Sequence, residues 1–186
     1  MIARLFLLIC LAIPASVSAN EERIAQADFP ERMQVDGQEL VLRNASLLEY
    51  LFVDVYSAAL LTPPNQPLNT PITARNPLHL ELYYYRDIDR EDVIKAAWVA
   101  LERQYDEPTL TRLRPGIERL HATFTDISAG DRYALTLDTE HALSLKYNGK
   151  ESFSSRDSEL ARAYVGIWLR ENGLSDSLRE ELTAGN

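Results

Sequence analysis

The stretch that decides the fold is Leu47-Leu48-Glu49-Tyr50-Leu51-Phe52-Val53-Asp54-Val55-Tyr56-Ser57-Ala58-Ala59-Leu60-Leu61. Its apolar density and its β-branched and aromatic residues are typical of a buried strand. It ends at Thr62-Pro63-Pro64-Asn65, where neither a helix nor a sheet continues. We predict one central strand, which would span roughly 50 Å at about 3.3 Å per residue, so it must bend or begin after Leu48.

Further strands are predicted on both sides of this stretch. Residues 33–35 and 39–42 flank Asp36-Gly37, the residue pair that type I′ hairpin turns favour, and residues 43–46 are predicted to turn the chain. Apolar residues alternate at 78–84, with Leu78, Leu80 and Leu82 on one face, and again at 133–137 and 143–147, before a second hairpin at Asn148-Gly149.

Helices are predicted in two blocks. Asp89 can cap a helix that runs to Tyr105, and a second helical pattern follows to Phe124, with a break expected at Pro115-Gly116. A helix over 156–170 and a short one from Ser175 close the chain. The blocks predict an α+β fold: an open-faced antiparallel sheet with helices packed on one face.

Residues 1–19 have the pattern of a secretory signal peptide. Arg4 precedes an apolar run, and Val17-Ser18-Ala19 forms a small-residue cleavage site. The run of about 10 residues is shorter than the roughly 20 that span a bilayer. We predict a cut after Ala19, a periplasmic or secreted product, and a single domain over 20–186. Cys10 would leave with the leader, so the mature chain would have no thiol.

Charge and residue content narrow the function. A formal net charge of −9 disfavours nucleic acid and anionic lipid as partners, and no stable membrane anchor is expected after cleavage. His79, His121 and His141 fall in different predicted elements, without metal-ligand spacing. The chain has no nucleophile elbow and no glycine-rich phosphate loop. We predict no cofactor, no metal and no catalytic residue; the sequence does not specify a protein partner.

Two features leave alternatives open. The run Tyr83-Tyr84-Tyr85 must send hydroxyls to both faces of its strand, either to line a pocket or to pack as amphipathic rings. Asp54 either faces solvent or is buried with Arg43, Arg86 or a tyrosine as partner.

The order of short motifs resembles the bacterial, secreted branch of the chalcone-isomerase-like family. The motifs are Val35-Asp36-Gly37-Gln38-Glu39-Leu40-Val41-Leu42, Val55-Tyr56, Tyr85-Arg86-Asp87-Ile88, Lys95-Ala96-Ala97-Trp98, Ala129-Gly130-Asp131, Asn148-Gly149-Lys150 and Ile167-Trp168-Leu169. The resemblance implies a cleft between sheet and helices. In the family's enzymes an arginine, a threonine and a tyrosine stabilise a phenolate and polarise a ketone. Non-catalytic relatives hold fatty acids there with arginine and tyrosine.

The catalytic positions of those enzymes carry other residues here. Gln38 and Glu39 stand at the arginine position, Leu51 at the threonine, and Glu91-Asp92 near the tyrosine. The resemblance therefore implies a non-catalytic protein that binds a small apolar or amphipathic, fatty-acid-like ligand. The residues predicted to line the site are Arg43, Tyr50, Phe52, Tyr56, Tyr84, Tyr85, Trp98 and Trp168. Two alternatives stay open: an isomerase or intramolecular lyase that uses Arg43 and Tyr85, and a protein-interaction module that uses the loop over 63–77.

Overall fold

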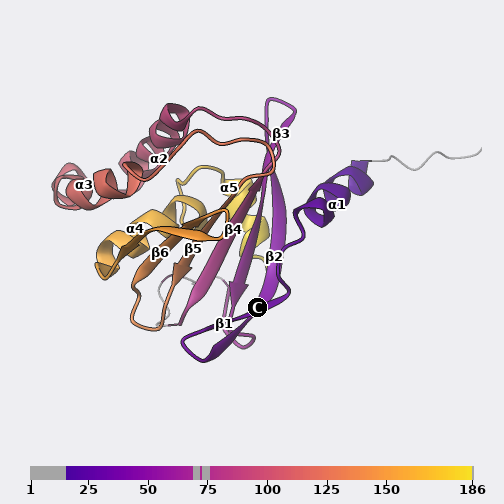
Figure 1. The fold of residues 1–186 in the computed structure, drawn as a ribbon, viewed down its shortest axis with the longest axis horizontal. Helices are drawn as coiled ribbons and strands as arrows, with labels where there is room; N and C mark the ends of the chain where they lie inside the picture. Colours follow the sequence, from indigo (N-terminus) through magenta and orange to yellow (C-terminus); the bar gives the residue numbers. More distant parts are fainter. Residues whose placement is uncertain (1–15, 69–71, 73–75, 186) are drawn as a thin grey trace, which may run out of the picture.

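A computed structural model describes residues 16–68, 72 and 76–185 of the chain. One seven-stranded antiparallel sheet has its strands in chain order, β1 to β7 (Figure 1). The elements are α1 (Ser16–Ala27), β1 (Arg32–Val35), β2 (Gln38–Tyr50), β3 (Val53–Thr62), β4 (Leu78–Tyr84), α2 (Arg90–Gln104), α3 (Glu107–His121), β5 (Arg132–Leu137), β6 (Leu143–Tyr147), β7 (Lys150–Ser155), α4 (Ser158–Leu169) and α5 (Asp176–Leu182). The predicted α+β class is confirmed.

The prediction of one strand over residues 47–61 is wrong. β2 ends at Tyr50, the chain turns at Leu51 and Phe52, and β3 returns antiparallel beside it. Both turn residues have positive φ, 49° and 64°. Apolar residues fill the turn as they fill the strands, so hydrophobic pattern alone did not reveal it. The turn predicted at residues 43–46 is instead a β-bulge between Leu42 and Asn44, through which β2 continues.

The main core lies between one face of the sheet and α2, α3, α4 and α5. From the sheet it takes Tyr56, Leu60 and Leu82, all nearly inaccessible to solvent. α4 buries most of its residues because it lies under α2 and α3. Fully burying one large apolar side chain contributes about 1.5–3 kcal/mol, so this layer supplies most of the folding free energy.

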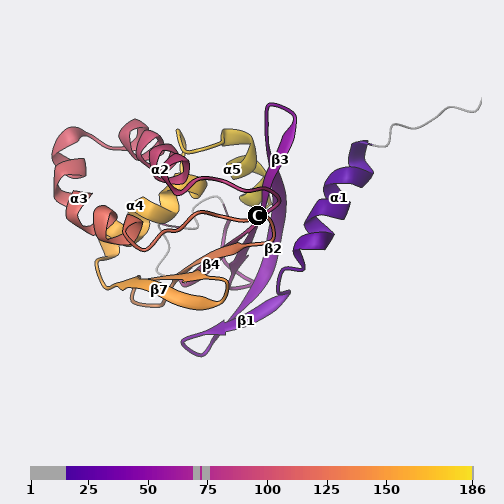
Figure 2. The same cartoon turned by 45° about the horizontal axis from the view of Figure 1, so that its top comes forward.

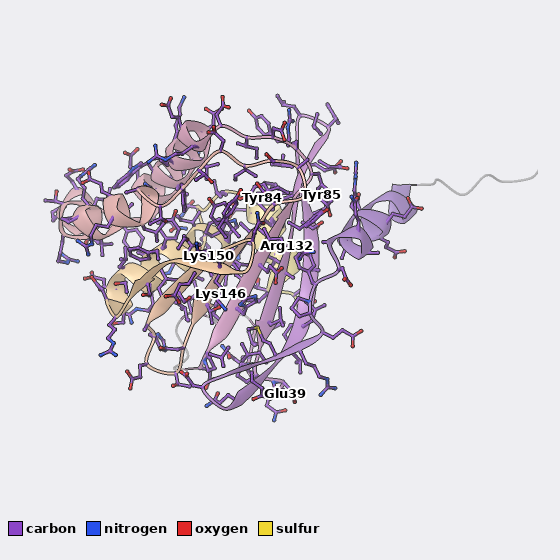
Figure 3. The ribbon with its side chains drawn as sticks, in the orientation of Figure 1. Glu39, Tyr84, Tyr85, Arg132, Lys146 and Lys150 are labelled. Atoms are coloured by element: carbon purple, nitrogen blue, oxygen red, sulfur yellow. The ribbon has the colours of Figure 1, made fainter. Side chains whose placement is uncertain are left out.

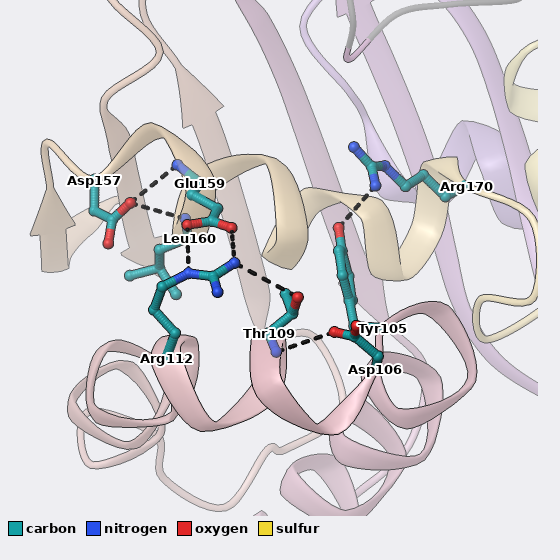
Figure 4. A network of polar contacts seen from close by, with 8 residues as sticks. All are labelled: Tyr105, Asp106, Thr109, Arg112, Asp157, Glu159, Leu160 and Arg170. Atoms are coloured by element: carbon teal, nitrogen blue, oxygen red, sulfur yellow. Dashed lines mark hydrogen bonds and ion pairs between the residues drawn. The ribbon is translucent and has the colours of Figure 1, made fainter.

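The break predicted at Pro115-Gly116 is also wrong, because α3 is continuous from Glu107 to His121. Packing outweighs the lost backbone hydrogen bond at Pro115. Gly116 lets α3 approach α4 so closely that an added Cβ would lie 2.9 Å from Leu160. Figure 4 shows how Arg112 donates to both carboxylate oxygens of Glu159 across this contact, at 3.1 and 2.5 Å.

On the opposite face of the sheet, α1 packs against β2 and β3. A small apolar cluster that includes Leu40 and Leu61 is buried on this face. Figure 2 shows α1 beside β2 and β3, apart from the other four helices. The prediction of helices on one face therefore holds for α2 to α5, and α1 adds a cover on the other. The prediction of one buried face for residues 78–84 is wrong, because β4 is buried on both faces.

The predicted leader lies mostly outside the described residues. Residues 1–15, with Arg4 and Cys10, are not described, and the predicted cut after Ala19 falls within α1. Among the described helices none is long and apolar enough to span a membrane.

Candidate functional site

A pocket of about 430 Å³ opens where the β2–β3 hairpin meets α1 and the end of β4. Its lining comes from these three elements and the residues just after β4. The lining residues are Arg23, Phe52, Val53, Asp54, Tyr85 and Arg86.

The backbone and hydroxyl of Tyr85 fix the floor of this pocket. Its amide N–H donates to the carbonyl of Val55 at 3.0 Å, which extends the pairing of β4 with β3 by one residue. Its hydroxyl lies 2.7 Å from Ser57 Oγ and also donates to the carbonyl of Arg23 on α1. Burial raises the pKa of Tyr85, so the phenol is neutral at physiological pH.

Charge in the pocket is positive on balance. Arg23 Nε lies 2.7 Å from Asp54 Oδ2, so these two charges neutralise each other. Arg86 is exposed and makes no hydrogen bond or ion pair within the part of the chain that the structure describes. Two guanidinium groups and one carboxylate leave one uncompensated positive charge, which favours an anionic group.

The wall of the pocket next to this cation is apolar. Phe52 is fully exposed and Val53 is 44% exposed. Beside them, Tyr50 and Leu51 are 68% and 73% exposed at the hairpin tip. A cation next to exposed apolar side chains is the arrangement that an amphipathic anion fits.

Three of the predicted lining residues meet in the main core, on the other face of the sheet. Tyr56 Oη accepts a hydrogen bond from Trp168 Nε1 at 3.0 Å, and the rings of Tyr56 and Tyr84 are 5.3 Å apart. All three residues are at least 91% buried. Burial raises the pKa of Tyr56 and Tyr84 well above the usual value of a phenol. This part of the core contains packed aromatic rings, and the Tyr56 hydroxyl is paired with the Trp168 indole.

The remaining two predicted residues lie elsewhere. Trp98 is partly buried on α2, with its ring 5.8 Å from that of His121 and the guanidinium of Arg114 over it. Arg43 donates to Thr62 Oγ1 and to the carbonyls of Pro63 and Gln66 at 3.0–3.1 Å. Thus the structure brings Phe52 and Tyr85 to the pocket, with Tyr50 beside it, and places Arg43 at the far end of β3.

The positions aligned with the family's catalytic residues do not converge. Glu39 is at the start of β2 and Leu51 follows its end, roughly 40 Å apart at about 3.3 Å per residue. Figure 3 shows Glu39 at the opposite end of the sheet from Tyr85. Leu51 was expected within a strand, but it is an exposed turn residue.

A buried polar chain lies on the same sheet face as the pocket. His79 is 2.8 Å from Thr136 Oγ1 and 3.3 Å from Glu81, and Glu81 accepts from Arg132 at 2.6 Å. Arg132 also donates to the carbonyl of Ala27, at the end of α1. Burial raises the pKa of Glu81, but the hydrogen bonds from His79 and Arg132 outweigh it and lower the pKa. This chain of contacts holds the end of α1 against β5.

Sequence reasoning did not place four of the lining residues: Arg23, Val53, Asp54 and Arg86. Arg23 lies in a polar segment for which no helix or strand is predicted, and Arg86 follows the strand predicted at 78–84. The available signal was Asp54, whose isolated carboxylate within an apolar run required either solvent or a cation. Its partner is Arg23, not Arg43, Arg86 or a tyrosine. No group of three or more metal-ligating side chains occurs among the described residues.

The fold and the site thus define an α+β protein. It has a curled, seven-stranded antiparallel sheet and a pocket at the β2–β3 hairpin. The chain belongs to the chalcone isomerase-like family, whose model matches residues 21–183. Among solved structures it is similar to a fatty-acid binding protein of Arabidopsis thaliana, at 17% identity and a TM-score of 0.64. That match covers 83% of this chain and 90% of the other. The search of curated proteins found no match.

Proposed function

We propose that this protein is a non-catalytic binding protein for a small amphipathic anion of the fatty-acid type. The observation that carries the proposal is the unpaired, exposed Arg86 beside the apolar wall of Phe52 and Val53. The family resemblance adds weight, since a protein named for fatty-acid binding shares the fold.

The chemistry of the pocket suits such a ligand. The guanidinium of Arg86 can donate two parallel hydrogen bonds to a carboxylate, and such charged bonds are roughly twice as strong as neutral ones. The acyl chain would cover Phe52 and Val53, which are otherwise in water. Asp54 does not repel the head group strongly, because Arg23 neutralises it.

Isomerase chemistry with Arg43 and Tyr85 has less support. Arg43 lies opposite Leu60 and Leu61 on β3, whereas Tyr85 bonds to Val55. That offset is roughly 18 Å of strand at about 3.3 Å per residue, so the two side chains do not share one site. The protein-interaction alternative rests on the loop over 63–77, part of which lies outside the described residues.

We further propose that the protein is exported and functions in the periplasm or outside the cell. A cut after Ala19 would leave Asn20–Ala27 of α1, so Arg23 would stay in the pocket. The family match begins at residue 21, which fits a leader that ends just before it.

Titration calorimetry with palmitate tests the function. We expect binding by the wild type and at least about tenfold weaker binding by Arg86→Gln, because a hydrogen bond to a charged group contributes about 1.5–3 kcal/mol. Arg156→Gln, at another exposed arginine, is the matched control and should bind like the wild type. Absence of binding, or equal binding by Arg86→Gln, would refute the proposal. A chalcone absorbance assay should show loss no faster than the spontaneous rate.

A further inference from the structure

Three two-residue turns in this sheet have the same backbone geometry, but one of them differs from the other two in its sequence. Asp36-Gly37 has φ of 48° and 78°, and Asn148-Gly149 has 49° and 79°. Leu51-Phe52 has 49° and 64°. Positive φ at both positions strongly favours Asn or Asp followed by Gly, as in the first two turns. The third turn has two bulky side chains where the backbone disfavours them.

Folding does not explain these two side chains, because neither is buried. Phe52 is completely exposed and Leu51 is 73% exposed. With Tyr50 and Val53 they form a tip of four exposed apolar residues, and among the described residues only Val99 is another exposed large hydrophobic. The tip also extends past the neighbouring segment, since the last backbone hydrogen bond between β3 and the chain just after β4 is the one from Tyr85 to Val55. Figure 1 shows this hairpin above the rest of the sheet.

We propose that the hairpin tip, Tyr50 to Val53, inserts into the interfacial region of a lipid bilayer. Its two turn residues would enter the acyl boundary, at the depth of about 5–10 Å reached by interfacial elements. Tyr50, at the base of the tip, has the amphipathic ring that is enriched at the headgroup level. The proposal goes beyond ligand binding and does not depend on it.

The size and shape of the tip favour a bilayer over a second copy of the chain. The four exposed side chains offer about 500 Å², because the two aromatic ones contribute about 150–250 Å² each and the two aliphatic ones less. A stable protein interface needs about 800 Å² from each partner. A projecting two-residue turn fits a deformable lipid surface without a matching hollow.

Charge at the base of the tip suits lipid phosphates. Arg86 is unpaired and lines the same pocket as Phe52, and Arg23 lies beside it. The chain as a whole carries −9, so a strongly anionic membrane would repel it. We therefore expect contact with zwitterionic phosphatidylcholine, driven mainly by apolar insertion.

Flotation of the full chain with phosphatidylcholine vesicles tests the proposal. The wild type should float, and Leu51→Asn should bind at least about tenfold more weakly, because one large buried apolar side chain accounts for that factor. Val99→Asn, at the exposed apolar residue on α2, is the matched control and should float like the wild type. Leu51→Asn should also raise the melting temperature, because Asn tolerates positive φ better than Leu. A higher melting temperature would show that the variant is folded, so that a loss of flotation does not come from misfolding.

Palmitate binding by Leu51→Asn separates membrane insertion from the proposed ligand binding. Leu51 does not line the pocket, so Leu51→Asn should bind palmitate like the wild type while losing the vesicles. A wild type that stays at the bottom of the gradient, or a Leu51→Asn variant that floats equally, would overturn membrane insertion. So would a concentration-dependent dimer in sedimentation experiments that Leu51→Asn abolishes, because the tip would then be a protein interface.

Discussion

Arg23 on α1 and Asp54 on β3 form an ion pair across the mouth of the pocket, with 2.7 Å between Nε and Oδ2. The two side chains are 42% and 26% exposed, so water screens much of their attraction. Exposed pairs of this kind contribute about 0.2–1 kcal/mol to stability. The pair matters more for the charge of the pocket, since it leaves Arg86 as the uncompensated cation.

Asp54→Asn should tighten the binding of palmitate several-fold, because the pocket loses its one carboxylate and keeps both guanidinium groups. The free energy of unfolding should fall by no more than about 1 kcal/mol. Calorimetry and urea unfolding measure the two effects. Glu102→Gln, at an exposed carboxylate on α2, should change neither. Weaker binding by Asp54→Asn would mean that Asp54 contacts the ligand directly.

The double substitution Leu51→Asn/Phe52→Gly should stabilise the protein by about 1–2 kcal/mol. Both residues have positive φ, where a bulky side chain costs about 1–2 kcal/mol, and neither loses burial. Urea unfolding of wild type and variant at one pH measures the change. An unchanged or lower stability would show that the tip is not strained.

Strands and helices were predicted most accurately where the turn residues and the spacing of apolar residues indicate the same structure. Asp36-Gly37 and Asn148-Gly149 marked their hairpins correctly, and α2 begins directly after Asp89 as predicted, although the Asp89 side chain makes no capping hydrogen bond. The Leu51-Phe52 turn was not predicted, because it has positive φ at both positions but lacks the Asn or Asp followed by Gly that such turns favour. Its side chains continue the strand pattern on both sides.

The site was less predictable than the fold because its residues meet only through tertiary packing. Arg23 and Asp54 are brought together by the docking of α1, a helix in a polar segment for which no helix or strand was predicted. Aromatic content led to Tyr56, Tyr84 and Trp168, but sequence could not show that their polar groups and rings pack against one another. The sheet face on which a side chain lies, its burial and its contact partners are determined only in the folded chain.

Trp168→Phe should destabilise the protein by about 1–3 kcal/mol, because Tyr56 Oη loses its donor inside the core. Tyr56→Phe combined with Trp168→Phe should cost less than the sum of the two single changes. Chemical denaturation of the four proteins in a double-mutant cycle measures the coupling. Additive losses would contradict a direct hydrogen bond.

Acid should destabilise the fold through His121. Burial, with the positive charge of Arg90 nearby, lowers the pKa of His121 to about 4. The unfolded chain, with a pKa near 6.5, takes up the proton first, so stability falls as the pH drops from about 6.5 towards 4. This loss is at most about 3.5 kcal/mol, at about 1.4 kcal/mol per pKa unit. Unfolding free energies measured at several pH values should decline less steeply in His121→Gln, while an identical decline would exclude His121 as the cause.

Palmitate should bind at the pocket beside the hairpin, and backbone amide NMR during a palmitate titration locates the bound ligand. The largest shift changes should fall on Phe52, Val53, Tyr85 and Arg86. Changes concentrated at Tyr56, Tyr84 and Trp168, in the core beneath the helices, would contradict it.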